Sequence, residues 1–295
     1  MISDTATDVF EEHRPVLMGV AYRMLGRVAD AEDVVQDAWL RWSGADRTEV
    51  REPRAYLVRV TTRLAIDRLR QIRARAEAYV GPWLPEPYVT DFADTVPDTA
   101  ERAVLADSVS FAVLVVLESL SPLERAVFVL REAFGHPYAE IAAVLDREEA
   151  AVRQLAARAR RHVDERRPRY EVDPAQRRDL TERFLAAAAG GNLEGLMALL
   201  APDVRLVGDS GGKAKAPLRI LESADKVGRF VIGAAGKGAS EALSFRFLEV
   251  NGGLAVLVLF GDKTDSVFQL DVVDGLVHAV YIVRNPDKLH SLSTG

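Results

Sequence analysis

Three side chains in the last third of the chain are of the types that carry out proton transfer. Asp209 ends an apolar segment, and Asp271 and His278 lie on either side of an Asp-Gly turn. A carboxylate or an imidazole in a concave apolar site can act as a general acid or base. A single histidine on a strand face is more often a hydrogen-bonded wall residue, so catalysis is the weaker interpretation and we expect no enzyme.

The composition argues against metal and membrane chemistry. The 295 residues include no cysteine, which excludes disulfides and thiolate metal sites, and we expect neither a cofactor nor a metal. The chain starts with polar and acidic residues instead of a signal peptide, and no apolar run is long enough to span a membrane. These features predict a cytoplasmic protein without a membrane partner.

Alternating strands and short helices would position the three side chains. Asn251-Gly252-Gly253 and Asp274-Gly275 are typical of tight hairpin turns. In a regular strand, His278 would share its face with Val280 and Ile282. Helices that precede a meander of strands predict an α+β domain. The expected helices are 175–189, 192–200 and 223–235, and the expected strands are 203–208, 243–250, 254–261, 266–273 and 276–284.

The first half of the chain has helical periodicity and locally dense arginine, although the formal net charge is −6. Residues 7–76 predict a helical bundle, and residues 101–119 predict a further helix. Ser121-Pro122-Leu123-Glu124 has the pattern of a capping box. Between the bundle and the helix 101–119, residues 79–100 carry four prolines and several acids, which predicts an extended linker.

Residues 137–163 predict a helix-turn-helix that reads DNA. Pro137 opens a short helix, a turn follows at Asp146-Arg147, and a second helix has one apolar and one basic face. An ordinary helical hairpin with a solvated basic face is the alternative. The arginines, the turn and the small residue Ala142 at the expected helix crossing favour DNA. The side chains expected to contact DNA are Glu149, Arg153, Gln154 and Arg158.

An acidic helix face near the start of the chain predicts a different partner. Asp30, Asp33 and Asp37 recur at i, i+3 and i+7, opposite the apolar positions Ala31 and Val35. DNA would repel this face, so we expect it to meet a basic protein surface. By itself, a solvated charged face explains the same pattern.

Three segments together resemble the extracytoplasmic-function (ECF) sigma factors of bacterial RNA polymerase. They are DAEDVVQDAWLRW at 30–42, the arginine-rich segment 52–75, and 120–160. The resemblance implies a first helical domain, 1–78, that binds the clamp region of core polymerase and the promoter −10 element. It implies a second helical domain, 106–168, that reads the −35 element. The implied polymerase contacts are Asp30, Asp33, Gln36 and Asp37, and the implied −10 contacts are Arg59, Arg63 and Arg70.

Three further segments resemble the ECF subgroup with a C-terminal SnoaL-like domain. They are WLPEP at 83–87 in the linker 79–105, GDSGGK at 208–213, and NPDKL at 285–289. Ser210 stands where the subgroup usually has glycine. The resemblance implies an α+β cone with a curved antiparallel sheet over 173–295, after two all-α domains of which the second is a helix-turn-helix.

We expect this third domain to bind the linker and so to modulate activity, in a direction that the sequence leaves open. The linker side would be Trp83, Leu84, Pro85, Glu86 and Pro87. The domain side would be Asp209, Gly211, Gly212, Lys213, Asn285, Pro286, Asp287, Lys288 and Leu289. A rigid spacer is the alternative for the linker. For the whole chain, the alternative is a stand-alone DNA-binding regulator whose last domain senses a small ligand or acts as an enzyme.

Overall fold

The computed structural model describes residues 3–46, 50–75, 79–89, 111–164, 173–238 and 243–292. The chain divides into two compact units. We call residues 1–78, 97–109 and 113–166 the helical unit, and residues 79–96, 110–112 and 167–295 the C-terminal unit. The described linker residues 79–89 therefore belong to the C-terminal unit. The predicted boundaries of the four segments remain predictions.

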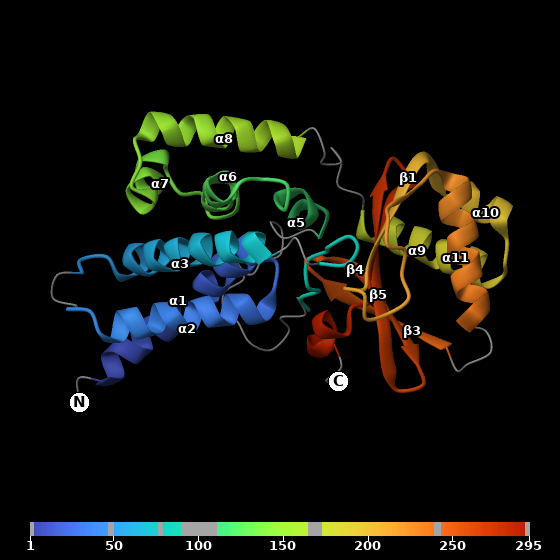
Figure 1. Ribbon diagram of the computed structural model, residues 1–295, viewed down its shortest axis with the longest axis horizontal. Coiled ribbons are helices and arrows are strands. Elements are labelled where there is room, and N and C mark those ends of the chain that lie inside the picture. Colours follow the sequence, from blue (N-terminus) through green and yellow to red (C-terminus); the bar gives the residue numbers. More distant parts are fainter. Residues whose placement is uncertain are drawn as a thin grey trace. The chain divides into compact units, whose positions relative to one another are not determined.

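The helical unit begins with three helices that pack on one another (Figure 1): α1 (Ser3–Leu25), α2 (Val28–Ser43) and α3 (Pro53–Arg75). Apolar residues at helical spacing form their common core, as the periodicity predicts. Leu17 and Met24 of α1, Ala31 of α2, and Leu57 and Leu69 of α3 are all buried. Gly26 separates α1 from α2 with a φ of 67°, a conformation that glycine adopts without strain.

The rest of this unit is the predicted helix-turn-helix with its supporting helices. These are α5 (Phe111–Leu117), of which residues 113–117 belong to this unit, α6 (Pro122–Phe128), the π-helix η3 (Val129–Ala133), α7 (Tyr138–Leu145) and α8 (Glu149–Asp164). Residues 101–110 of the predicted helix 101–119 lie outside the described residues. Asp146 ends α7 in the left-handed conformation, and Val152, Ala156 and Ala159 of α8 are buried as expected.

Replacing Ser121 by alanine should lower the unfolding free energy of the helical unit by about 1 kcal/mol. The Ser121 hydroxyl accepts a hydrogen bond from the Glu124 amide, and the Glu124 carboxylate accepts one from the Ser121 amide at 3.1 Å. The bond from the Ser121 hydroxyl lowers the pKa of Glu124. This stabilisation is therefore present above the ordinary glutamate pKa and is lost as pH falls through the lowered one.

Urea unfolding followed by helical circular dichroism, at neutral and acid pH, measures both effects. Ser43→Ala is the control, because the exposed Ser43 hydroxyl donates to the carbonyl of Leu40 in its own helix and caps no helix start. Equal losses in the two variants would contradict the capping role.

The C-terminal unit is a six-stranded sheet with helices α9 (Pro174–Ala189), α10 (Leu193–Met197) and α11 (Ala224–Gly238). The strands lie in the order β2-β1-β6-β5-β4-β3. Their bounds are β1 Leu200–Asp209, β2 Leu221–Glu222, β3 Leu243–Val250, β4 Gly253–Phe260, β5 Lys263–Val273 and β6 Leu276–Val283. The two predicted hairpin turns are present, and the α+β fold class is confirmed. The sheet is mixed, however, because β1 and β6 pair in parallel.

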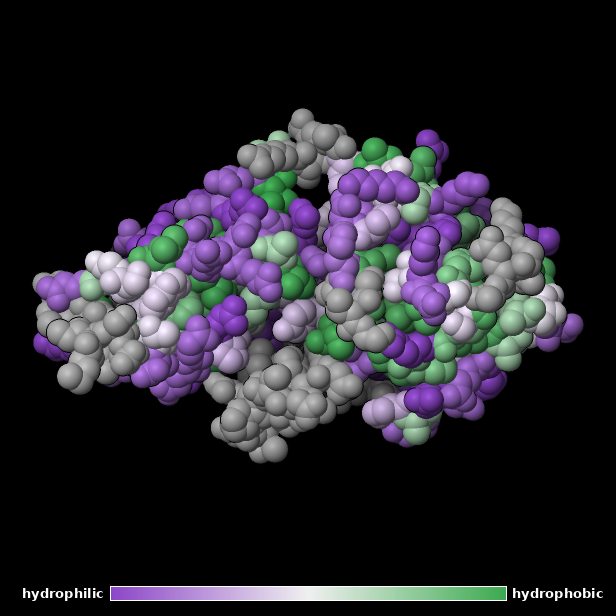
Figure 2. Space-filling view, turned by 90° about the horizontal axis from the view of Figure 1, so that it is seen from below, coloured by the Kyte–Doolittle hydropathy of each residue, from purple (hydrophilic) through white to green (hydrophobic). Residues whose placement is uncertain are grey.

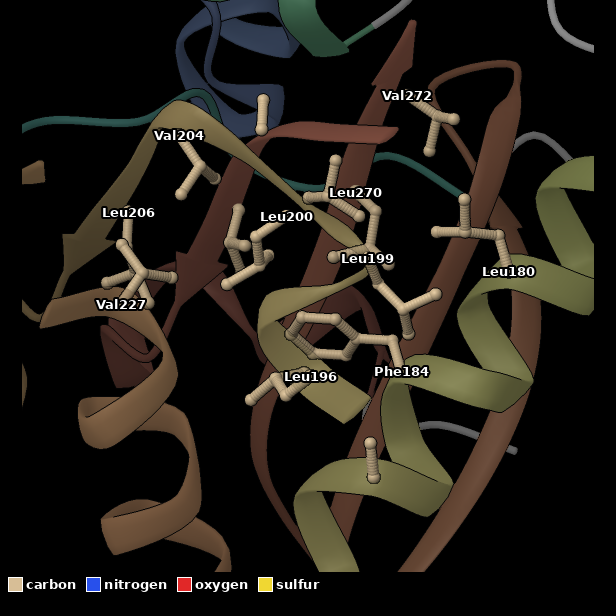
Figure 3. Packing of buried hydrophobic residues seen from close by; sticks show 14 of the residues in the cluster. Leu180, Phe184, Leu196, Leu199, Leu200, Val204, Leu206, Val227, Leu270 and Val272 are labelled. Atoms are coloured by element: carbon tan, nitrogen blue, oxygen red, sulfur yellow. The ribbon is translucent and has the colours of Figure 1, made fainter. Parts of the chain in front are cut away.

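The core of the C-terminal unit lies between the sheet and its helices (Figure 3). Phe184 of α9 and Leu196 of α10 meet Leu270 of β5 there. A regular strand would put Val277 on the face opposite His278 and Val280, but Val277 and Val280 both belong to this core, so the expected regular alternation is wrong here. The cause is a β-bulge: Asp271 pairs with Ala279 and Val272 pairs with Val277, which leaves His278 as the extra residue.

Apolar side chains are also visible at the surface of the C-terminal unit (Figure 2). Leu218 is 59% exposed, and Phe245 on the edge strand β3 is 40% exposed. Among the residues that the structure describes, no helix combines the length and the apolar character needed to cross a bilayer.

Candidate functional site

The linker lies on the C-terminal unit, where one carboxylate binds several of its groups. Asp209, at the end of β1, is fully buried. One of its oxygens accepts hydrogen bonds from the Leu84 amide at 2.8 Å and from Lys288 Nζ at 2.6 Å. The other accepts from the Tyr79 hydroxyl and from the Gly211 amide at 3.1 Å. One side chain thus holds two points of the linker, five residues apart.

Lys288 completes this arrangement from the end of the chain. Its side chain is only 3% exposed, and Nζ donates to the Leu84 carbonyl at 2.5 Å as well as to Asp209. The same ammonium lies 4.0 Å from the centre of the Trp83 ring, a cation–π contact. The backbone N–H and C=O of Leu84 are therefore both bound by a buried ion pair. We call the group Tyr79, Leu84, Asp209 and Lys288 the linker clasp.

The loop after Asp209 requires glycine where it meets the linker. Gly211 and Gly212 have φ values of 56° and 74°. A Cβ on Gly211 would lie 2.5 Å from Asn285 Nδ2, and one on Gly212 would lie 3.1 Å from the Val80 side chain. Ser210 is not among the residues with positive φ, so serine fits this position without strain.

A second contact holds the other end of the described linker. The Tyr88 amide donates to Asn251 Oδ1 at 3.2 Å, and the Asn251 amide donates back to the Tyr88 carbonyl at 2.9 Å. Val89 forms an antiparallel bridge with Val250, the last residue of β3. The linker therefore extends from the end of β1 to the β3–β4 turn.

The structure brings most of the predicted regulatory residues together. Leu84, Pro85, Glu86 and Pro87 are buried, as are Asn285, Lys288 and Leu289. Lys213 and Asp287 form an exposed ion pair beside the clasp, and Pro286 starts the short helix η4 (Pro286–Lys288).

Sequence reasoning did not find Tyr79, Tyr88 or Asn251. Asn251 was assigned only to a turn, although its amide side chain also binds the linker. Tyr79 also accepts a hydrogen bond from Asn285 Nδ2 at 3.0 Å. The available signal was an aromatic residue with a hydroxyl next to the WLPEP segment.

The three candidates for proton chemistry do not form one site. The Asp209 carboxylate already accepts hydrogen bonds from the Tyr79 hydroxyl and the Leu84 amide of the linker. Burial raises the pKa of Asp271, against the opposing charges of His278 and Arg177, and burial together with Asp271 raises the pKa of Tyr281. His278 is 39% exposed and lies 3.9 Å from Asp203.

The acidic face of α2 is smaller than the spacing predicts. Asp33, Gln36 and Asp37 are exposed, but Asp30 is buried. Two nitrogens of Arg68 on α3 donate to Asp30 Oδ1, at 2.9 and 2.6 Å. The expectation that Asp30 belongs to the exposed face is corrected here, because the α2–α3 packing turns Asp30 toward that arginine.

The predicted DNA contacts of α8 are exposed, and several carry ion-pair partners. Arg153 pairs with Glu149 at 2.5 Å, and Arg158 lies 3.2 Å from Glu124 on α6. Gln154 is exposed. Both arginine side chains are 61% exposed, so these pairs cost little to break and leave the basic face available to a stronger anion.

The predicted −10 arginines of α3 lie in different surroundings. Arg59 lies over the ring of Tyr56, and Arg70 pairs with Asp67 at 3.0 Å. Arg63 Nε donates to the Val144 carbonyl of α7 at 2.8 Å.

Comparison with known proteins identifies the two helical segments. The family model for Sigma-70 region 2 matches residues 9–75, and that for Sigma-70 region 4 matches residues 110–163. The ECF RNA polymerase sigma factor SigJ of Mycobacterium tuberculosis is 43% identical over 95% of this chain and 91% of its own length. The probable ECF sigma factor SigI of the same species is 32% identical over 98% of this chain and 96% of its own.

The match extends to the third domain. The crystal structure of M. tuberculosis SigJ has a TM-score of 0.75 and 39% identity, and the alignment covers 99% of both chains. The alignment therefore extends over the C-terminal unit as well as the two sigma segments. The chain therefore belongs to the ECF RNA polymerase sigma factors and carries a SnoaL-like C-terminal domain.

Proposed function

We propose that this sigma factor directs core RNA polymerase to promoters by binding the −10 and −35 elements together. Its SnoaL-like domain controls this two-element binding through the linker clasp. Asp33, Gln36 and Asp37 contact the polymerase clamp region, and Asp30 orients Arg68 beside them. Arg59, Arg63 and Arg70 contact the −10 element. Glu149, Arg153, Gln154 and Arg158 contact the −35 element. Contacts to DNA phosphates supply affinity, and contacts to base edges supply sequence specificity.

The regulatory part is supported above all by the buried ion pair of Asp209 and Lys288 on the Leu84 peptide. Residues 79–89 lie in the connection between α3, which carries the proposed −10 contacts, and α5, which precedes the helix-turn-helix. When the clasp holds these residues, they are not free to extend, and the connection between α3 and α5 is effectively shorter. The distance that the two DNA-reading segments can span then depends on whether the clasp is closed.

Reconstituted transcription with core polymerase tests both parts. Three proteins are compared: the full chain, a chain that lacks residues 285–295, and a chain that ends near residue 170. We expect core-dependent initiation by the full chain and a change of severalfold when residues 285–295, which include Lys288, are absent. No initiation by any of them would contradict the sigma function. Equal activity of all three would contradict only the regulatory part.

A further inference from the structure

The β3–β4 turn, which binds the far end of the described linker, is itself held from β5. Gln269 of β5 is buried, and its Nε2 donates to the carbonyls of Val250, at 2.7 Å, and Gly253, at 3.1 Å. Val250 and Gly253 are paired residues of β3 and β4, and the turn residues Asn251 and Gly252 lie between them. One side-chain amide thus ties together the two ends of the turn.

The strand register explains why this side chain reaches the turn. Gln269 pairs with Ala255 of β4, two residues along the strand from Gly253. Long side chains on neighbouring strands reach such diagonal neighbours on the same face. A Cβ on Gly253 would lie 3.4 Å from Gln269 Nε2, so the amide packs directly against the end of the turn.

Only the donor half of this amide is used. Both contacts are to carbonyl oxygens, which accept hydrogen bonds and cannot donate them, so they select the NH2 group of Gln269. Gln269 Oε1 is buried and has no hydrogen-bond partner among the residues that the structure describes. A side chain of the same length without N–H groups would therefore fill the space and lose both bonds to the turn.

The conformation of the turn determines how it meets the linker. Asn251 and Gly252 have φ values of 54° and 65°, the left-handed conformation of a two-residue hairpin turn. In this conformation the buried Asn251 presents both its backbone amide and its side-chain oxygen to Tyr88. Asparagine adopts positive φ less readily than glycine, so hydrogen bonds that hold both ends of the turn stabilise this arrangement.

We propose that Gln269 is the positioning residue of a second linker anchor, which opens and closes independently of the linker clasp. The second anchor consists of Val250 and Asn251, which bind Val89 and Tyr88 of the linker. It shares no residue with the clasp, and β5 and β6 separate β4 from β1 in the sheet. Gln269 acts through the turn, because its donors bind the turn and not the linker.

Two anchors allow the linker to be released in steps. When only the clasp opens, the linker residues before Tyr88 become free, and when only the second anchor opens, those after Leu84 become free. Each released residue can add at most about 3.3–3.6 Å to the connection between α3 and α5. The longest connection therefore requires both to open. The consequence for transcription rests on the proposed control of promoter binding by the linker.

Hydrogen exchange in the full chain tests the positioning role. Gln269→Met keeps the length of the side chain and removes its donors. We expect exchange at the Tyr88 amide to rise about ten- to a hundredfold, because two hydrogen bonds that hold the turn are lost. Exchange at the Leu84 amide, which Asp209 binds, should change by less than about threefold, as expected for independent sites.

Two further variants separate a positioning role from a general loss of stability. Asn251→Gly permits the same turn and removes the side chain that binds Tyr88, so it should also raise exchange at Tyr88. In this background Gln269→Met should add less than about threefold, since the group through which it acts is absent. Ser266→Ala, a buried substitution on the same strand, is the matched control and should leave Tyr88 protected.

The positioning role is overturned if Gln269→Met leaves Tyr88 protected, if it raises exchange at Leu84 to the same extent, or if its effect is undiminished in Asn251→Gly. Transcription with core polymerase then tests the proposed function separately. Gln269→Met should change initiation in the same direction as removal of residues 285–295. Faster exchange at Tyr88 with unchanged initiation would overturn control by the linker and leave the second anchor standing.

Discussion

Lys288→Met should release the linker and increase hydrogen exchange at the Leu84 amide by at least a hundredfold. The substitution removes the cation from a pair in which Asp209 is fully buried and the lysine is 3% exposed. Removal of one partner leaves an uncompensated buried charge, which costs about 3–5 kcal/mol. Since about 1.4 kcal/mol corresponds to a factor of ten, the opening equilibrium of the linker shifts by more than two orders of magnitude.

Lys213→Met is the matched control. Lys213 also pairs with an aspartate, Asp287, but its side chain is 55% exposed. Exposed pairs contribute about 0–1 kcal/mol, so exchange at Leu84 should change by less than about fivefold. The double variant Asp209→Asn/Lys288→Met leaves no unpaired charge and should recover part of the protection. Exchange in Lys288→Met that matches the control would show that the ion pair does not hold the linker.

Leu84→Ala should lower the unfolding free energy of the C-terminal unit by about 2–5 kcal/mol. The Leu84 side chain is completely buried, although it belongs to a linker segment. Its loss leaves a cavity while the hydrogen bonds of the Leu84 peptide to Asp209 and Lys288 can still form. The variant thus separates the apolar contribution of the clasp from its polar one.

Guanidinium unfolding of the full chain measures this effect in the transition of the C-terminal unit. Val80→Ala is the control, because Val80 is in the same linker segment but is 49% exposed. Its effect should stay within about 0.5 kcal/mol. In transcription, Leu84→Ala should act in the same direction as removal of residues 285–295. If the two changes shifted transcription in opposite directions, this would contradict control of promoter binding by a single clasp.

The sequence by itself determined the local features of this protein. Helical periodicity predicted the helical bundle and the apolar face of α8, and the Asn-Gly and Asp-Gly pairs predicted both hairpin turns. Such signals depend on residues a few positions apart, whose geometry is set by the backbone of a single helix or turn. The motifs at 83–87, 208–213 and 285–289 also indicated which segments meet at the linker.

Only the tertiary structure decided how distant residues pair. Asp209 meets Tyr79 across 130 positions of the chain, and Arg68 buries Asp30 across 38. The bulge at His278 and the parallel pairing of β1 with β6 likewise depend on which strands become neighbours. A local pattern carries no information on that choice, because the energy of a buried ion pair or a strand register depends on groups that the fold brings from far away.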